Sequence, residues 1–278
     1  GLATVTGLTA LKAAHGAKFE DKTSYPGLTK DVSDLKDETK WQEDKAVDVA
    51  AGNTVNFKLT SNVPDDLLNY IIPDVDEPEV VTPAAAKALV SVDERGNYTL
   101  TFHDQMVEGL DSNNDFTVFL DSNKNGVLDD GEKVLTATTD YTISENVKHT
   151  DEDGTVTGTC DFEIEMDLVD LYNRDIITDD DIEAATPIVV IYSAKLSDTA
   201  TAGSYENKAW TTVDENDWES SPDTVDVNTY KLNIFKYDQA NPEKGLEGAK
   251  FELYQKGEND AVIEDSKKYL SSDANGNI

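Results

Sequence analysis

The chain has 278 residues, enough for two domains of ordinary size, because one hydrophobic core rarely serves more than about 250 residues. Its formal net charge of −34 excludes binding through a positive surface to nucleic acid or anionic lipid. The single cysteine, Cys160, excludes an intrachain disulfide and a cysteine-based zinc cluster, and His15, His103 and His149 lie far apart without ligand spacing, so no zinc site is expected.

Short segments in which apolar and polar residues alternate run along the chain, with turn residues between them. This pattern predicts many short β-strands, as in a β-sandwich. The clearest strands, in chain order, centre on Val55, Phe57 and Leu59; on Tyr98, Leu100 and Phe102; on Phe116, Val118 and Leu120; on the apolar run 188–192; and on Leu232 and Ile234. Helical periodicity is weak and predicts only short helices or turns at 8–14, 83–88 and 179–184. No apolar run approaches the roughly 18 residues of a membrane span. We expect an all-β protein.

A domain boundary is expected near Tyr230. The Ser-, Pro- and Asp-rich segment 219–226 precedes it, and a new strand pattern follows it. This divides the chain into an N-terminal segment 1–25 of unknown identity, a first unit 26–229 and a second unit 230–278. The second unit is too short for a complete sandwich, and the sequence stops within a strand-turn pattern, so we expect the chain to be part of a longer precursor.

Residues two apart in a strand share one face, so the neighbours of a residue predict whether it faces the core. By this rule, three polar residues occupy positions where an apolar residue is expected. Lys30 shares its face with Leu28 and Val32, and Asp104 and Asn207 share the faces of the apolar residues in their own strands. Each residue on its own is more often a strand end, where the core gives way to solvent. Together they indicate a buried amine, a buried acid and a buried carboxamide.

Such a set of side chains can form an isopeptide bond. Burial disfavours both charges, so the lysine tends to lose its proton and the aspartate tends to keep one. The neutral amine then attacks the asparagine carboxamide, whose oxygen accepts a hydrogen bond from the acid, and ammonia leaves. We predict a Lys30–Asn207 cross-link with Asp104 as the catalytic proton donor. Because each molecule reacts once with itself, the protein is not expected to be an enzyme.

These residues lie in motifs that resemble the isopeptide-forming domains of Gram-positive fimbrial proteins. The motifs are WQEDKAVDVAAGNTVNFKLTSNVP at 41–64, YTLTFHDQMVEGL at 98–110, IVVIYSAKLSDTATAG at 188–203 followed by ENKAWTTV, and PGLTKDV around Lys30. The resemblance implies an immunoglobulin-like β-sandwich over 26–229, with the family's linking lysine at Lys30, its aspartate at Asp104 and its asparagine at Asn207. If the alignment slips, the linking lysine would be one of three others nearby, Lys22, Lys36 or Lys40.

The second unit carries its own resemblance. YKLNIFKYDQANPEKGLEGAKFELYQ, at 230–255, is similar to the start of a collagen-adhesin B-type (Cna B-like) domain. The resemblance implies that Lys236 is its isopeptide lysine and that the bonding partner lies beyond residue 278. We find no YPKN-like pilin motif and no LPxTG sorting signal. Sortase-mediated linkage to other pilin subunits, and a place on the cell wall of a Gram-positive bacterium, are therefore implied by the resemblance alone.

The segment 121–132, DSNKNGVLDDGE, fits the calcium-loop pattern D-x-[DN]-x-[DN]-G-x5-E. The predicted ligands of a calcium ion are Asp121, Asn123, Asn125, Val127 through its backbone carbonyl, Asp129 and Glu132. Strand-like flanks at 116–120 and 133–136 place the loop in a hairpin, and we expect a structural role for the ion. The alternative is an Asn/Asp/Gly-rich turn without an ion. No organic cofactor is expected.

Three functions remain open. The first is a structural subunit of a pilus or stalk, without membrane insertion. The second is an adhesin that binds a host protein or glycan, with the Pro-, Glu- and Val-rich segment 74–86 as a contact surface. The third, a hydrolase that uses acid pairs such as Glu163 and Glu165 or the run 179–181, is disfavoured because adjacent acids are common in so acidic a chain.

Overall fold

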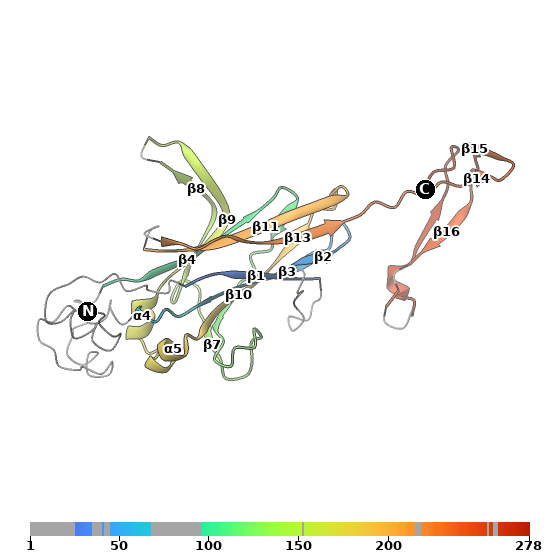
Figure 1. The fold of residues 1–278 in the computed structure, drawn as a ribbon. Coiled ribbons are helices and arrows are strands. Elements are labelled where there is room, and N and C mark those ends of the chain that lie inside the picture. The colour runs from blue at the N-terminus through green and yellow to red at the C-terminus, as the bar shows by residue number, and fades with distance from the viewer. Residues whose placement is uncertain are drawn as a thin grey trace, which may run out of the picture. The chain divides into compact units, whose positions relative to one another are not determined.

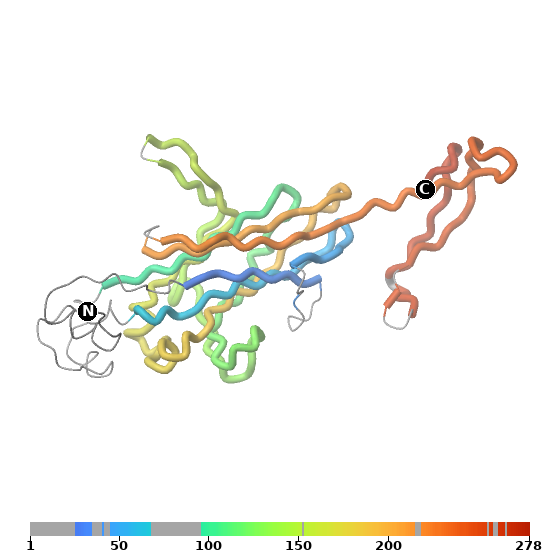
Figure 2. The backbone as a smooth tube through the Cα atoms, viewed as in Figure 1, coloured from blue at the N-terminus to red at the C-terminus, as the bar shows by residue number. Residues whose placement is uncertain are grey.

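The computed structural model describes residues 26–34, 41, 45–67, 96–151, 153–214, 218–254, 256–257 and 261–278. The chain divides into two compact units, Gly1–Thr229 and Tyr230–Ile278, each of which is coloured along the chain in Figures 1 and 2. The N-terminal segment 1–25, the segment 74–86, the predicted helices at 8–14 and 83–88, and the alternative lysines Lys22, Lys36 and Lys40 lie outside the described residues.

The described part of the first unit consists mainly of two β-sheets (Figure 1). The six-stranded sheet has the order β1 (Thr29–Ser33), β3 (Thr54–Asn62), β10 (Pro187–Leu196), β6 (Thr117–Leu120) and β7 (Lys133–Leu135), and β5 (Leu110–Ser112) also pairs with β10. The seven-stranded sheet has the order β2 (Ala46–Asp48), β13 (Asp223–Thr229), β11 (Gly203–Val213), β4 (Thr99–Met106), β9 (Val156–Asp167) and β8 (Thr142–Thr150), and β12 (Trp218–Glu219) pairs with β11. The protein is all-β, as the sequence predicts.

The core of this unit follows the predicted alternation. Val55, Phe57 and Leu59 of β3 are fully buried, and in β4 the side chains of Leu100 and Phe102 are buried as well. Strand β10 is buried along nearly its whole length, in agreement with its continuous apolar run. One of its faces joins the core, and the residues of its other face pack with Phe119 and Trp41 in a smaller cluster.

Two short helices, α4 (Leu168–Asn173) and α5 (Asp179–Ala184), connect β9 to β10. The predicted short helix or turn at 179–184 is therefore confirmed. Thr178 and Asp181 form a capping box at the start of α5, and the Tyr172 hydroxyl donates to Asp179 Oδ1 at 2.6 Å. Two acids of the run 179–181 thus have structural contacts. Among the described residues, no helix is both long and apolar enough to cross a membrane.

The second unit contains two two-stranded sheets. β14 (Tyr237–Asp238) pairs with β15 (Asn241–Gly245), and β16 (Lys250–Leu253) pairs with β17 (Lys268–Ser271). A short 3-10 helix, η4 (Glu264–Ser266), lies between β16 and β17 in the chain. The strand predicted around Leu232 and Ile234 is wrong: both residues lie outside the strands, and Leu232 is 62% exposed. A pair of two-stranded sheets offers too little apolar surface to bury such a segment.

Candidate cross-linking site

The Lys30 side chain lies between the two sheets of the first unit. In β1 the residues Lys30 and Val32 are both fully buried, and Lys30 is paired with Leu59 of β3. The backbone N–H of Lys30 donates to Asp223 Oδ2 at 2.8 Å, which ties β1 to β13 of the other sheet. The position of this lysine is therefore fixed by strand pairing on one side and by a side-chain acceptor on the other.

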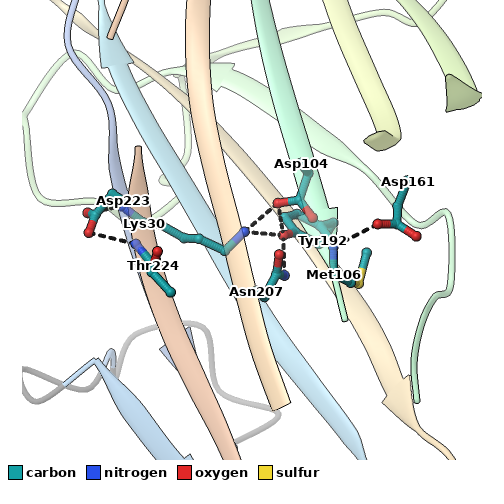
Figure 3. A network of polar contacts seen from close by, with 8 residues as sticks. All are labelled: Lys30, Asp104, Met106, Asp161, Tyr192, Asn207, Asp223 and Thr224. Atoms are coloured by element: carbon teal, nitrogen blue, oxygen red, sulfur yellow. Dashed lines mark hydrogen bonds and ion pairs between the residues drawn. The ribbon is translucent and has the colours of Figure 1, made fainter. Parts of the chain in front are cut away.

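Asp104 and Asn207 project from the seven-stranded sheet into the same core. Strands β4 and β11 are antiparallel neighbours, with Asn207 opposite Met106 and Ala209 opposite Asp104. Because residues two apart share a face, the side chains of Asp104 and Asn207 lie diagonally beside each other. Neither is exposed to solvent. The structure thus brings the three predicted residues, Lys30, Asp104 and Asn207, into one network (Figure 3).

The hydroxyl of Tyr192, on β10, lies at the centre of this network (Figure 3). It accepts hydrogen bonds from Lys30 Nζ at 2.7 Å and from Asn207 Nδ2 at 2.9 Å, and it donates to Asp104 Oδ2 at 2.5 Å. Lys30 Nζ also contacts Asp104 Oδ2 directly. The lysine nitrogen and the asparagine nitrogen therefore touch the same oxygen atom.

Sequence reasoning missed Tyr192, because it reads as the last member of an apolar run. A signal was available in the strand period: Tyr192 shares a face with Ile188 and Val190, which belong to the main core. A tyrosine that faces a core must find a partner for its hydroxyl, and the polar residues predicted for the same core are the natural partners.

Aromatic rings surround the network. The ring of Tyr192 stacks on Phe57 with a centroid distance of 5.3 Å, and Phe162 meets it edge-on at 4.8 Å. Phe116 lies on another side at 5.9 Å, and Lys30 Nζ is 5.2 Å from the centre of the Phe57 ring. These contacts leave little room for water, so the polar groups lose most of their hydration.

Burial determines the protonation of the reacting groups. It lowers the pKa of the Lys30 amine and raises the pKa of the Asp104 carboxyl, although each group's charge opposes the shift of the other. Burial also raises the pKa of the Tyr192 phenol well above its usual value. The directions of the first two shifts favour a neutral amine beside a neutral acid, which is the pair of protonation states that amide formation needs.

Two oxygens in the network lack a hydrogen-bond donor, namely Asp104 Oδ1 and Asn207 Oδ1. A buried acceptor without a donor costs about 1–3 kcal/mol. A proton on the Asp104 carboxyl would turn one of these acceptors into a donor. The geometry therefore gives a second reason, independent of the pKa, for Asp104 to carry a proton.

The other predicted cross-link residue, Lys236, lies in the second unit and is exposed. Its backbone N–H donates to the Gly276 carbonyl at 2.7 Å, and its carbonyl accepts from the Leu246 N–H at 2.9 Å. Its role as an isopeptide lysine remains a prediction.

The predicted calcium loop lies in a hairpin, as its flanks indicate. Strands β6 and β7 on its two sides are antiparallel, with Leu120 paired with Lys133. The carboxylate of Asp121 is buried and accepts from the backbone N–H groups of Asn125 and Gly126 at 3.2 and 2.7 Å. Gly126 has a positive φ of 74°, which suits the sharp turn at this position.

The remaining predicted calcium ligands gather by hydrogen bonding. The side-chain amides of Asn123 and Asn125 both donate to Asp129 Oδ2, at 2.7 and 2.6 Å, and these bonds hold the pKa of Asp129 below its usual value. The Asp129 N–H donates to Glu132 Oε2 at 3.1 Å, and the Val127 N–H donates to Asn125 Oδ1 at 2.8 Å. The oxygen-rich side chains thus converge, which is compatible with a hard cation and also with a self-contained turn.

A second cluster that sequence reasoning missed contains His103, His149, Cys160 and Glu163. The expectation that the histidines lie too far apart to share a site is wrong for two of them, because the ring centroids of His103 and His149 are 5.7 Å apart. The alternation of residues along β9 concealed this cluster in the sequence. Strict alternation along β9 would place Cys160 on the face of Phe162, opposite Glu163, yet its sulfur lies 3.9 Å from His103 Nδ1.

A scan against protein-family models finds no match for the chain, and no curated protein matches it. Solved structures of pilins do match. The T6 backbone pilin of serotype M6 Streptococcus pyogenes is 19% identical over 91% of this chain and 45% of that one, with a TM-score of 0.44. The full-length major pilin SpaD from Corynebacterium diphtheriae is 16% identical over 91% of this chain and 49% of that one, with a TM-score of 0.47.

The major pilin subunit BcpA of Bacillus cereus is 17% identical over 91% of this chain and 54% of that one, with a TM-score of 0.39. The chain therefore spans about half the length of the pilins it matches. The chain is an all-β protein that is similar to major pilins of bacterial surfaces.

Proposed function

We propose that the chain is a structural subunit of a cell-surface pilus or stalk, and that its first unit cross-links itself through Lys30 and Asn207. The observation that carries the cross-link is the meeting of an amine, a carboxyl group and a carboxamide around one hydroxyl in a dry core. The proposed role in a pilus or stalk rests on the sequence resemblance to fimbrial domains. An intramolecular cross-link suits such a role.

The proposed reaction exchanges one amide for another. The lone pair of Lys30 Nζ attacks Asn207 Cγ, and the Asn207 oxygen, which then develops negative charge, accepts a hydrogen bond from protonated Asp104. The Cγ–Nδ2 bond breaks, a proton from Nζ passes to Nδ2, and ammonia leaves. The Asp104 carboxyl is protonated again at the end, so it acts as a catalytic residue in a single turnover. The Tyr192 hydroxyl holds both nitrogens and the carboxyl in position.

The cross-link would join the two sheets of the sandwich. Lys30 lies on β1 of the six-stranded sheet and Asn207 on β11 of the seven-stranded sheet, so the bond closes a loop over most of the first unit. The chain-entropy model for a cross-link of this span gives a stabilisation on the order of 5 kcal/mol. Under tension, the sheets would be unable to separate until a covalent bond breaks, which suits a load-bearing fibre.

Intact mass spectrometry of the denatured protein tests the reaction. Loss of ammonia makes the wild-type chain lighter than its sequence mass by about 17 Da for each bond formed. Asp104→Ala should restore the full mass, apart from the substitution, because the proton donor is gone. Asp111→Ala, which changes an exposed acid in β5, should keep the loss. Peptide mapping should then find one branched peptide that joins Lys30 and Asn207, and a wild-type chain of full mass would refute the cross-link.

We also propose that the subunit acts outside the cell, on the surface of a Gram-positive bacterium, where sortase links it to other pilin subunits. The resemblance of the sequence to fimbrial domains supports this. Immunogold labelling of the intact bacterium with antibodies to this chain should decorate fibres. Deletion of the sortase genes should release the protein as monomers into the medium. Retention inside the cell would contradict the proposal.

We further propose that the loop 121–132 binds calcium in a structural role. Support comes from its all-oxygen donor set, which suits a hard cation, and from the convergence of Asn123, Asn125 and Asp129. Calcium should raise the melting temperature of the protein more than magnesium does at the same concentration. Asp121→Ala should abolish the difference, and Asp130→Ala, in the same loop but outside the ligand positions, should retain it. Equal responses of the two variants would contradict this assignment.

A further inference from the structure

Four side chains that carry metal-binding atoms meet on the outer face of the seven-stranded sheet, opposite the face that holds Asp104. They come from three adjacent strands: His103 from β4, His149 from β8, and Cys160 and Glu163 from β9. Their ligand atoms, namely one nitrogen of each imidazole, the sulfur and one carboxylate oxygen, all lie within 4.8 Å of one another. His103, which lies 46 positions before His149 in the sequence, thus joins three residues of the β8–β9 hairpin in one compact group of donors.

The distances within this group are close to those of a tetrahedral metal site. With zinc bond lengths, two ligands at a tetrahedral angle lie about 3.6 Å apart for nitrogen and sulfur, and about 3.4 Å apart for nitrogen and oxygen. Cys160 Sγ is 3.4 Å from His149 Nε2 and 3.9 Å from His103 Nδ1. Glu163 Oε1 is 2.7 and 2.8 Å from the same two nitrogens, which are hydrogen-bond distances. To reach the nitrogen–oxygen spacing of a zinc site, the Glu163 oxygen would have to move about 0.6–0.7 Å further from each of the two nitrogens.

One of the ligands is already held in place. His103 Nε2 lies 2.7 Å from the hydroxyl oxygen of Thr212, and the imidazole ring stacks on the indole of Trp210 with a centroid distance of 5.1 Å and an angle of 6°. Such a contact on the second ring nitrogen fixes the orientation of a metal-binding histidine. Nδ1 of His103 is therefore directed at the cluster before any ion arrives.

The cluster is accessible from solvent. A surface pocket of about 360 Å³ is lined by His103, His149, Gly158 and Trp210, among others. The side chain of His149 is 33% exposed, whereas that of His103 is 5% exposed. The net charge of −34 raises the concentration of cations near the surface. An ion can therefore reach the site through the His149 side.

We propose that His103, His149, Cys160 and Glu163 form a zinc-binding site. Two imidazoles, one thiolate and one carboxylate are a donor set that suits zinc and does not suit calcium or magnesium, which prefer oxygen ligands. The two negative ligands balance the charge of the ion, so a partly buried site stays neutral. On binding, the thiol gives up its proton to solvent, and the metal replaces the hydrogen bonds between Glu163 and the two imidazoles.

Four protein ligands leave no open position, which is typical of a structural zinc site rather than a catalytic one. The site would fasten the edge of the seven-stranded sheet. β8 is the terminal strand of that sheet, pairs with β9, and has mostly exposed or half-buried residues. A metal shared by β8, β9 and β4 would hold this hairpin to the body of the sheet and protect its free edge.

Cobalt(II) titration of the full chain tests the proposal, after reduction of Cys160 and removal of metals with a chelator. Tetrahedral cobalt with a thiolate ligand gives visible d–d bands and a sulfur-to-cobalt charge-transfer band. We expect both bands to saturate at one cobalt per chain and to disappear when one equivalent of zinc is added. Weak octahedral absorption, or no saturation, would overturn the proposal.

Variants identify the ligands. Cys160→Ser should remove the charge-transfer band, and His149→Ala and Glu163→Gln should each weaken zinc binding by more than the roughly 10- to 100-fold that loss of an outer hydrogen bond costs. Thr212→Val should fall within that 10- to 100-fold range, since it removes only the contact that orients His103.

Matched controls keep the test specific. Glu165→Gln changes an exposed acid two residues from Glu163, and His15→Ala changes the third histidine of the chain, so neither should alter the affinity. His149 is partly exposed, so its variant should fold even if Cys160→Ser does not, and near-ultraviolet circular dichroism checks both. Equal zinc affinities of the wild type, His149→Ala and Glu163→Gln would overturn the assignment.

Discussion

Strand β4 presents two polar sites on its two faces through adjacent residues. Asp104 points into the core, where it meets Lys30 and Asn207, and His103 points to the outer face, where it meets Glu163. The inner site has no solvent access, so burial lowers the pKa of its amine and raises the pKa of its acid, which are the directions that the proposed covalent reaction needs. The outer site opens to solvent through His149, whose side chain is 33% exposed, so a cation can reach its donor atoms. The two proposals thus place a covalent cross-link and a metal cross-link on opposite faces of one strand, and the two faces differ in their access to solvent.

The largest expected effect is on the inner face. Lys30→Met keeps an apolar stem in the core and removes the nucleophile, so the cross-link cannot form. We expect the free energy of unfolding to fall by about 5 kcal/mol, the chain-entropy estimate for a loop of this span. Urea unfolding of the variant and the wild type measures this directly.

Lys195→Met is the matched control. The Lys195 side chain is 45% exposed and pairs only with the exposed Asp198, at 2.8 Å, in the described part of the chain. Exposed pairs of this kind contribute about 0–1 kcal/mol. If Lys30→Met were as stable as Lys195→Met, the inner site would not be covalent, and the comparison between the two faces would fail.

The outer face should give the next largest effect, and a reversible one. If the zinc proposal holds, zinc at 100 times its dissociation constant should add about 2.7 kcal/mol to the free energy of unfolding. Excess chelator should remove the gain. The mass deficit from the inner face should stay unchanged throughout, which separates the two sites. A zinc-induced gain that persists in His149→Ala would show that the metal binds elsewhere.

Tyr192→Phe should separate positioning from chemistry on the inner face. The ring contacts with Phe57 and Phe162 remain, and the hydroxyl that holds both nitrogens is lost. We expect cross-linking to slow about tenfold, which corresponds to ~1.4 kcal/mol on the barrier. The time course of the mass change after refolding measures the rate. An unchanged rate would show that Lys30, Asp104 and Asn207 need no organising hydroxyl.

Asp66 tests what burial does to an acid when the neighbouring charge is that of another acid, Asp65, instead of that of a lysine. Burial raises its pKa to about 6, and its Oδ1 has no hydrogen-bond partner. Because the folded-state pKa lies above the unfolded value of 3.8, stability should rise as pH falls from about 6 towards 4. Asp66→Asn should remove this slope and stabilise the protein near neutral pH by up to about 3 kcal/mol, since each pKa unit corresponds to about 1.4 kcal/mol.

Glu165→Gln is the control for this effect, since Glu165 is an exposed acid on another strand, β9. Melting temperatures of both variants across this pH range provide the measurement. A slope that survives in Asp66→Asn would show that another acid is responsible.

The inner site could be predicted from the sequence because the strand period marks its residues and because the motifs around them resemble a known family. Lys30, Asp104 and Asn207 each break an apolar face, and no knowledge of strand pairing was needed to see it. The hydroxyl of Tyr192 was concealed because tyrosine also counts as apolar. The outer site could not be predicted, since it depends on the pairing of β8, β9 and β4 and on a local departure from alternation at Cys160. In the second unit, Leu232 fits the alternating pattern of a strand, but it is exposed and lies outside the strands. An alternating sequence forms a strand only where a neighbouring strand is available to pair with it.

One pairing in the seven-stranded sheet bears on how a fibre would break. β2 runs parallel to β13, with Val47 beside Val227, unlike the antiparallel pairs around it. In a chain without the Lys30–Asn207 bond, traction on the entry to β2 and on the exit from β13, which lie at opposite ends of this pair, would slide the strands lengthwise. The hydrogen bonds between β2 and β13 would then be loaded in shear and would resist together, instead of breaking one after another.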